Sequence, residues 1–301
     1  MINTLKNKNL LHAHNIRKVY PDPKQDCGHK VILDDIDLSV SKGEFVTVVG
    51  PSGCGKSTLL RIILGQEKQT LGDVFLNKEH IGYPDQSRGI VFQNYSLFDN
   101  KTVFDNVMSS YYFKNGFFSR LINRQEYNQA KEEAMFYLKQ VKLQDAIHKY
   151  PAELSGGMKQ RVAIAQSLIA KPEILLMDEP FSALDPTTRE ELQLFTKEVA
   201  SKNNMTVFFV SHDLEEAIFL GTRLIVLSQY YQKEGREIKN QGARIVEDID
   251  VSKFNSQESK SSEEFKSLIK NLLQKGFDPS YLQHVQEFNL SHKDSFKDER
   301  S

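Results

Sequence analysis

The stretch GPSGCGKST, residues 50–58, constrains the fold of this chain more than any other feature. It matches the spacing G-x-x-x-x-G-K-[ST], follows a short apolar run typical of a buried strand, and opens a helical pattern. Glycines let backbone N–H groups turn inward around phosphates, and the positive end of the helix points at them. The sequence therefore predicts a phosphate-binding loop between a strand and a helix. The residues expected to contact the phosphates are Gly50, Pro51, Ser52, Gly53, Cys54, Gly55, Lys56, Ser57 and Thr58.

Three side chains of this loop have specific expected roles. Lys56 is expected to bridge the β- and γ-phosphates, the Ser57 hydroxyl to bind Mg²⁺, and Thr58 to hold the region of the α-phosphate. The alternative, a chance glycine-rich turn, is disfavoured because a strand and a helix flank the loop.

An acidic pair follows the apolar run ILLM, residues 174–177. The run indicates a buried strand, and ligands bind at the carboxyl ends of strands in an α/β sheet. Asp178 is expected to hold Mg²⁺, and Glu179 to orient and deprotonate an attacking water. A solvated acidic pair at a strand end is the alternative, and the phosphate-binding loop makes it less favoured.

Strands and helices alternate along most of the chain. This order indicates βαβ units and an α/β fold with a mostly parallel sheet. The predicted strands are 43–50, 88–93, 173–179, 206–211 and 223–228, the predicted helices are 57–65, 188–202 and 213–221, and residues 102–153 carry a helical, more charged pattern.

A second candidate phosphate site lies in LSGGMKQR, residues 154–161. Ser155, Gly156 and Gly157 open a helix, and a Ser hydroxyl with exposed N–H groups at a helix N-terminus suits a phosphate. Taken alone, this Ser-Gly-Gly favours the alternative of a simple N-cap with no ligand.

Together these motifs, in this order and spacing, resemble the ATPases of the ABC family over roughly residues 10–230. The resemblance implies a P-loop NTPase fold with a mostly parallel, RecA-like core, an antiparallel β part and an inserted helical subdomain at about 94–160. It also implies that two such subunits dimerise head to tail, so that each ATP lies between one subunit's phosphate loop and the other's Ser155, Gly156 and Gly157.

The resemblance assigns four more residues. Gln93, after GIVF, would contact Mg²⁺ or the attacking water, and His212, after TVFFVS, would contact the γ-phosphate during catalysis. Asp185, in SALD, would cross the dimer interface, although an ordinary turn Asp before a proline stays an alternative. Tyr20, in IRKVY, would stack on adenine, although it could instead pack in a sheet.

Within the family, the motifs look most like the importer ATPases for nitrate, taurine, other sulfonates and bicarbonate. The expected function is ATP hydrolysis that energises uptake of a small, anionic solute. The implied cofactors are ATP and Mg²⁺, and the implied partners are integral membrane permease subunits, a second ATPase subunit in a homodimer or pseudo-dimer, and an extracytoplasmic substrate-binding protein. Two alternatives stay open: a subunit of an exporter or lipid-handling complex, and an ATP-switched regulatory module.

Composition bears on partners and location. The chain has 301 residues with 39 Lys and Arg against 40 Asp and Glu, a formal net charge of -1 that gives no support for nucleic-acid binding. Its two cysteines suggest no disulfide framework. No apolar run approaches the about 18 residues of a membrane helix, and the N-terminus lacks the apolar core of a signal peptide. We expect a cytosolic chain, peripheral to the cytoplasmic face of the inner membrane through its permease.

A composition shift near Ser228 divides the chain into an ATPase domain, 1–230, and a C-terminal extension, 231–301. The extension is expected to contain a short hairpin with ARIVEDI as its second arm, a polar linker at 252–262, and a helix at about 262–275. A capping box of Ser261 and Glu264 and a C-cap at Gly276 would bound this helix. The last ten or so residues are expected to be frayed.

One face of the predicted C-terminal helix is apolar. This face requires a cover: the domain's own core, a second subunit or another partner, and the first of these is favoured. The residues of the apolar face are Phe265, Leu268, Ile269, Leu272 and Leu273.

Overall fold

A computed structural model describes residues 9–25, 27–92, 96–115, 124–233, 236–237, 240–256 and 258–295. The chain divides into two compact units, which we describe separately. The first unit comprises residues 1–84 and 206–301, and the second comprises 85–205. Among the described residues, no helix combines the length and the apolar character needed to span a bilayer.

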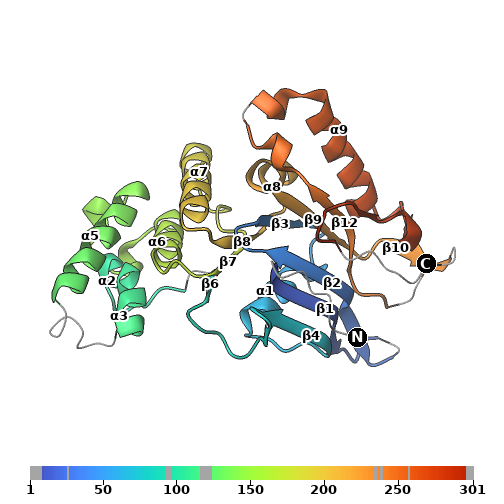
Figure 1. Cartoon of the computed structure of the whole chain (residues 1–301), viewed down its shortest axis with the longest axis horizontal. Helices are drawn as coiled ribbons and strands as arrows, with labels where there is room; N and C mark the ends of the chain where they lie inside the picture. Colours follow the sequence, from blue (N-terminus) through green and yellow to red (C-terminus); the bar gives the residue numbers. More distant parts are fainter. Residues whose placement is uncertain are drawn as a thin grey trace. The chain divides into compact units, whose positions relative to one another are not determined.

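The first unit contains the phosphate loop and the predicted extension (Figure 1). Its N-terminal part, within residues 1–84, contains β1 (Asn9–Pro21), β2 (His29–Ser41), β3 (Phe45–Val49), α1 (Lys56–Leu64), β4 (Leu71–Leu76) and β5 (Glu79–His80). Its second-half strands and helices are β8 (Thr206–Val210), α8 (Leu214–Leu220), β9 (Arg223–Ser228), β10 (Tyr231–Lys233), β11 (Arg236–Glu237), β12 (Arg244–Asp250), α9 (Glu263–Leu272), β13 (Gln283–His284) and β14 (Asn289–Leu290). Short 3-10 or π turns cover Ser252–Phe254, Glu258–Ser261, Leu273–Phe277 and Val285–Glu287.

The core sheet of the first unit has the strand order β14-β12-β9-β3-β8. Strand β3 is buried along its whole length, because both of its neighbours, β8 and β9, run parallel to it and supply apolar residues. Parallel strands end at the same edge of a sheet, so the phosphate loop after β3 and the turn after β8 leave from adjacent positions.

A second, antiparallel sheet has the order β2-β1-β4-β5. It provides the antiparallel β part that the family resemblance implies. The sequence pattern did not reveal its long strands, since register shifts near residues 13–18 interrupt the pairing of β1 and break the alternation of apolar residues.

The second unit contains a parallel strand pair and the helices between its strands. Its elements are β6 (Arg88–Val91), α2 (Val103–Val107), α3 (Ser109–Asn115), α5 (Arg124–Gln140), α6 (Gly156–Ile169), β7 (Ile174–Asp178) and α7 (Pro186–Lys202), with 3-10 turns at Gln144–Ala146 and Pro151–Glu153. Strand β6 pairs with β7 in parallel, Val91 lying opposite Met177. The predicted strands at 88–93 and 173–179 and the predicted helix at 188–202 therefore form close to their expected bounds.

The C-terminal segment is built into the first unit rather than set apart from it. Residues 244–250 form β12, which pairs antiparallel with β9, and β14 then pairs in parallel with β12. The prediction that ARIVEDI forms the second arm of the hairpin is wrong: β10 pairs with β11 instead. The apolar residues of β12 explain this choice, because they are buried in the core sheet and a small hairpin could not cover them.

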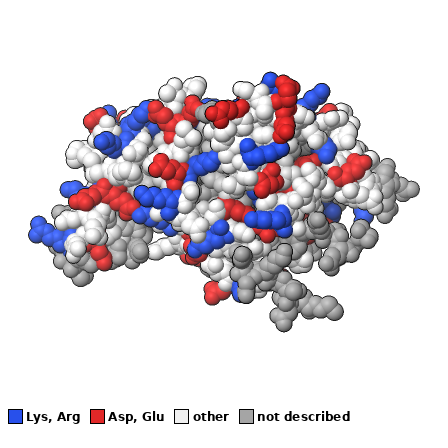
Figure 2. Space-filling model, turned by 45° about the horizontal axis from the view of Figure 1, so that its top comes forward, with Lys and Arg blue, Asp and Glu red and all other residues white. Residues whose placement is uncertain are grey.

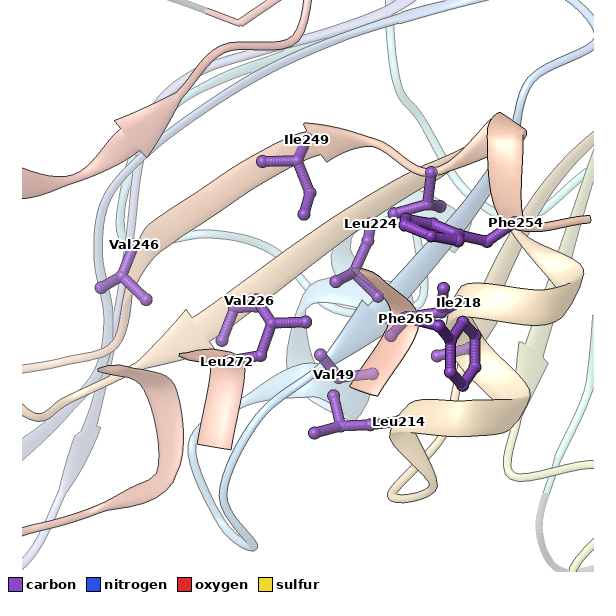
Figure 3. Packing of buried hydrophobic residues seen from close by; sticks show 12 residues of the cluster. Val49, Leu214, Ile218, Leu224, Val226, Val246, Ile249, Phe254, Phe265 and Leu272 are labelled. Atoms are coloured by element: carbon purple, nitrogen blue, oxygen red, sulfur yellow. The ribbon is translucent and has the colours of Figure 1, made fainter. Parts of the chain in front are cut away.

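Helix α9 packs its apolar stripe on the core of the first unit (Figure 3). Phe265 and Leu272 are each 1% exposed among residues of β9, β12 and α8, and Leu268 and Ile269 pack against the same cluster. Leu273 is 48% exposed, so it lies off this stripe. The prediction that this face packs on the domain's own core is confirmed for Phe265, Leu268, Ile269 and Leu272.

The ends of α9 differ from the predicted caps. Ser262, not Ser261, is the N-cap, and its side chain accepts a hydrogen bond from the Phe265 N–H. Ser261 instead ends the preceding 3-10 turn. Gly276 lies inside the π turn that follows the helix, and a Cβ added there would meet Val226 at 2.5 Å. The glycine is therefore required by close packing on the sheet and not by a C-cap.

Candidate functional site

The phosphate loop joins β3 to α1 in the first unit. Lys56 is only 8% exposed, and its ammonium group donates to the carbonyls of Gly50 at 2.8 Å and Pro51 at 3.0 Å. The Cys54 side chain is buried, and burial raises the pKa of its thiol. Ser52 and Gly53 are exposed at the tip of the loop. The loop is thus closed around its lysine while its tip faces outward.

Two glycines of the loop are required by both conformation and space. Gly50 has φ +152°, and a Cβ there would lie 2.1 Å from the Leu227 carbonyl oxygen. Gly55 has φ +105° and precedes α1, and a Cβ there would lie 2.8 Å from the side chains of Ile32 and Leu33. An L-residue with a side chain would be strained at either position. Because these two glycines have no side chain, the backbone of the loop can lie directly against the neighbouring strands.

Tyr20, at the end of β1, is held next to the loop's helix. Its hydroxyl donates to Glu67 and forms a side-chain hydrogen bond with Thr58, and burial raises its pKa. The Lys18 ammonium lies 4.8 Å from the ring centroid and 2.9 Å from the Glu67 carboxylate. Because Lys18 covers part of the ring, stacking of adenine on Tyr20 would use the remaining surface, and it stays a prediction.

His212 lies in the turn between β8 and α8. The Ser211 N–H donates to the Val48 carbonyl at 3.3 Å, which places this turn beside the end of β3. Asp213 caps α8 by accepting from the N–H groups of Glu215 and Glu216. The exposed His212 is therefore carried on a turn fixed on both sides, at the edge of the sheet where the phosphate loop begins.

The acidic pair ends β7 in the second unit. Asp178 is the last residue of the strand, and Glu179 follows with φ +49°, a left-handed conformation that is rare for a glutamate. The Ser182 hydroxyl donates to the Glu179 carbonyl at 3.0 Å, and the Ser182 N–H donates to it at 3.3 Å. Such strain concentrates at functional positions, where surrounding contacts hold it. This backbone feature has no signal in the sequence.

The Ser-Gly-Gly stretch opens α6 in the second unit as expected. The Ser155 oxygen accepts from the Met158 N–H at 3.3 Å, a bond that leaves its hydroxyl hydrogen to donate elsewhere. Ser155 and Gly156 are exposed. Helix geometry gives the N–H groups of Gly156 and Gly157 no carbonyl partner within α6. The structure therefore presents a Ser hydroxyl and helix N–H groups on the surface of this unit.

The start of α6 lies against the segment that carries Asp185. A Cβ added to Gly157 would meet the Ala183 carbonyl oxygen at 3.2 Å. Asp185 itself is exposed and caps α7, accepting from the Thr188 N–H at 3.0 Å, and this hydrogen bond lowers its pKa. Arg161 of α6 is attracted to Asp185 and donates to the carbonyls of the 141–142 turn. Sequence reasoning assigned no role to Arg161, although it ends the quoted motif.

Gln93 lies outside the described residues, so its predicted contact with Mg²⁺ or the attacking water stays a prediction. Among the described residues on the face drawn in Figure 2, Lys and Arg alternate with Asp and Glu and form no broad basic patch.

Comparison with known proteins gives the family. The family model described as "ABC transporter" matches residues 33–182. The chain is 41% identical to the nitrate import ATP-binding protein NrtD of Synechococcus elongatus, over 74% of this chain and 77% of that protein. It is 36% identical to an aliphatic sulfonates import ATP-binding protein, SsuB, of Bacillus cereus, over 83% and 90%, and 40% identical to the bicarbonate transport ATP-binding protein CmpD of a Synechocystis strain, over 72% and 74%.

Among solved structures, the chain resembles the dimeric ATP-binding cassette MJ0796 in a post-hydrolysis state bound to ADP and Pi. The TM-score is 0.65 at 29% identity, covering 80% of this chain and 98% of that one. The expected α/β fold of a P-loop NTPase is thereby confirmed. The chain belongs to the ABC transporter family, as an ATP-binding subunit that hydrolyses ATP.

Proposed function

We propose that the chain energises uptake of a small anionic solute through a separate permease, as one of two ATPase subunits that share their nucleotides. The observation that supports this proposal is the exposed N-terminus of α6, where Ser155 and Gly156 would form half of a phosphate site. The phosphate loop of the other subunit would form the complementary half.

The phosphate loop is suited to the triphosphate. An ammonium group has three N–H donors, and the carbonyls of Gly50 and Pro51 use two of those of Lys56. The third remains for a phosphate oxygen, next to the N–H groups at the start of α1. Charge-assisted bonds of this kind contribute about 1.5–3 kcal/mol each, so Lys56 supplies a substantial part of the binding energy.

The donor set also fits Mg²⁺. Ser57 offers a hydroxyl in the first turn of α1, and Asp178 offers a carboxylate at the end of β7, which are the oxygen ligands that Mg²⁺ prefers. Gln93 would add an amide oxygen. When bound, the ion supplies positive charge to the β- and γ-phosphate oxygens.

Glu179 is the proposed base, and His212 the proposed γ-phosphate contact. The left-handed backbone at Glu179 turns the chain sharply at the end of β7, and both Ser182 bonds hold it there. These bonds fix the backbone from which the Glu179 side chain extends, and its carboxylate can orient and deprotonate a water. His212, carried on a fixed turn, can donate to the γ-phosphate.

The chemical class of the transported solute is inferred from the relatives. Three of them are import proteins for nitrate, aliphatic sulfonates and bicarbonate, all of them small anions. We infer a solute of this chemical class, delivered by an extracytoplasmic binding protein. The second unit, with its helices α2, α3 and α5, is the part proposed to contact the permease, at the cytoplasmic face of the membrane.

Mixing two inactive variants tests the shared site. Lys56→Ala removes the phosphate-loop contact, and Ser155→Arg blocks the surface half-site, so neither homodimer can form a complete site. A heterodimer of the two has one site with both defects and one with neither. We expect the mixture to regain up to about a quarter of wild-type ATPase activity per chain, because random pairing makes half the dimers mixed and each keeps one of two sites.

The control is each variant mixed with itself at the same total concentration. If the mixture is as inactive as either variant while both still fold, the shared-site arrangement is wrong. Uptake is tested separately: the permease that co-purifies with the chain, reconstituted in vesicles, should take up nitrate, sulfonate or bicarbonate only with ATP. Export, or ATP-independent movement, would contradict the importer assignment.

A further inference from the structure

A cluster of metal-ligand type side chains lies in the first unit away from the phosphate loop. It consists of Glu44, immediately before β3, and His292 and Asp294, which follow β14. One ligand atom from each residue lies within 4.8 Å of the other two. The chain positions are far apart, so the fold of the C-terminal segment brings the three together.

The turn that carries His292 and Asp294 is held firmly on the core sheet. The His292 N–H donates to the Asp248 carbonyl at 2.9 Å, and the Ser295 hydroxyl donates to the Asp248 carboxylate. The Ser41 hydroxyl donates to the Asp294 carboxylate at 3.0 Å. Side chains fixed in this way lose little freedom when they bind an ion.

The donor atoms are buried, and one lacks a partner. The side chains of His292 and Glu44 are 5% and 11% exposed. Oε2 of Glu44 accepts from Arg223 at 3.2 Å, but its buried Oε1 has no hydrogen-bond partner among the described residues. His292 Nε2 lies 4.0 Å from that oxygen. Glu44 lies close enough to Asp294 for the two carboxyl groups to share a proton, and a cation bound between them would take the place of that proton.

The charges of the pocket point the same way. Arg223 forms two 2.7 Å hydrogen bonds with the Asp248 carboxylate and one with Glu44. One guanidinium therefore faces Asp248, Glu44 and the nearby Asp294. Lys293 is a second cation near Asp294, so three carboxyl groups, those of Asp248, Glu44 and Asp294, lie with two cations around the cluster.

We propose that Glu44, His292 and Asp294 form a binding site for a divalent ion of the zinc type. One imidazole nitrogen with two carboxylates suits Zn²⁺, whereas Mg²⁺ prefers oxygen ligands throughout and keeps several waters. The ion would join the segment after β14 to the start of β3. It is separate from the Mg²⁺ proposed to accompany ATP, and its presence does not depend on the proposed transport function.

One hydrogen bond must change for this ion to bind. The Asp294 N–H donates to His292 Nδ1 at 3.2 Å, so the ring proton is on Nε2, the nitrogen that faces Glu44. Binding through Nε2 transfers that proton to Nδ1 and gives up this single long hydrogen bond. Its contribution is small beside a metal–nitrogen bond.

Titration of the full-length chain with ZnCl₂, without nucleotide, tests the proposal by calorimetry. We expect one tight site per chain, and a rise in the unfolding midpoint when Zn²⁺ is added. Asp294→Asn and His292→Gln should each lower the Zn²⁺ affinity by at least about tenfold. The matched controls Asp278→Asn and His148→Gln alter a partly exposed aspartate and an exposed histidine away from the cluster, and they should bind as the wild type does.

Three results would overturn the proposal. The first is the absence of tight Zn²⁺ binding by the folded wild-type chain. The second is that the cluster variants bind Zn²⁺ as tightly as their controls do, and the third is that controls and cluster variants lose affinity equally. If a cluster variant does not fold, the binding of Co²⁺ to the wild-type chain is measured in place of the comparison between variants. The wild-type chain should show visible absorption bands of Co²⁺ bound by nitrogen and oxygen, and Zn²⁺ should abolish them, whereas the spectrum of aqueous Co²⁺ alone would contradict the site.

Discussion

Helix α1 begins inside the protein, and helix α6 begins at its surface. The first residue of α1, Lys56, is buried and bonded to its own loop, and Gly55 before it has a left-handed backbone. Before α6, Ser155 is exposed and has the extended backbone of an ordinary N-cap. Both ends suit a phosphate, but only the first encloses it with its own chain. The difference fits the proposal that the first is a binding site in itself and that the second completes a site only in a dimer.

The largest expected difference concerns nucleotide binding by the isolated chain. Lys56→Ala should lower ATP affinity of the monomer by about 10–100-fold and turnover by at least about 100-fold. Ser155→Ala should leave monomer affinity unchanged and reduce turnover only, because its phosphate belongs to the other subunit. Binding of a fluorescent ATP analogue at low protein concentration separates the two. Weaker monomer binding in Ser155→Ala would remove the distinction between the two helix ends.

The next largest expected difference is in folding stability, when the glycines at the starts of α1 and α6, Gly55 and Gly157, are replaced by alanine. Gly55→Ala adds left-handed strain and overpacking against Ile32 and Leu33, and should cost about 2–4 kcal/mol of unfolding free energy. Gly157→Ala lies in a helix, where alanine is favoured, and its Cβ would meet the Ala183 oxygen at 3.2 Å and a Leu184 methyl at 3.5 Å, so its cost should stay within about 1 kcal/mol. Denaturant unfolding measures both. Equal costs would show that the surface end is as tightly constrained as the buried one.

A cap substitution separates the structural role of Ser155 from its binding role. Ser155→Ala should cost about 1 kcal/mol because the cap of α6 is lost, whereas Ser155→Asp should retain the cap. Both should be deficient in turnover, since Asp would repel a phosphate. Thermal unfolding and ATPase assays on the two variants check this. Active Ser155→Asp would mean that capping is the only role of this residue.

The smallest expected difference in stability is between two variants at Glu179. Glu179→Gly should be as stable as Glu179→Ala or up to about 1 kcal/mol more stable, because glycine relieves the left-handed strain. Both should lose hydrolysis. At Glu190, within α7, the same pair should rank in the opposite order, alanine being about 1 kcal/mol better. Unfolding midpoints give the ranking, and the same order at both positions would refute the strain.

Much of the sheet was readable from the sequence, because short apolar runs such as FVTVV and ILLM form strands that are buried on both faces. Local patterns also located both helix ends. Contacts between distant residues were not readable. The pairing of β12 with β9 and the position of His292 depend on partners that no local pattern names.

The same reason explains the error at the C-terminus. The prediction of a frayed end treated polar residues such as Asp294 and Ser295 as solvated, but they bond to Ser41 and Asp248. The prediction is therefore wrong for residues 292–295, while residues 296–301 lie outside the described residues. The left-handed backbone of Glu179 was likewise invisible, since a glutamate gives no conformational signal. At the start of α9, the capping-box pattern with Glu264 favoured Ser261, and only the structure showed that the adjacent Ser262 is the N-cap.

The pairing of β14 with β12 has a consequence for synthesis of the chain. Because β14 lies at residues 289–290 and covers the outer edge of β12, this edge stays unprotected until residue 290 has left the ribosome. The nascent ATPase therefore exposes the open edge of β12 while residues 251–290 are synthesised, and the apolar surface that α9 later covers is open until residue 272 has followed. In the cell, chaperones would bind this intermediate, and release would follow completion of the sheet.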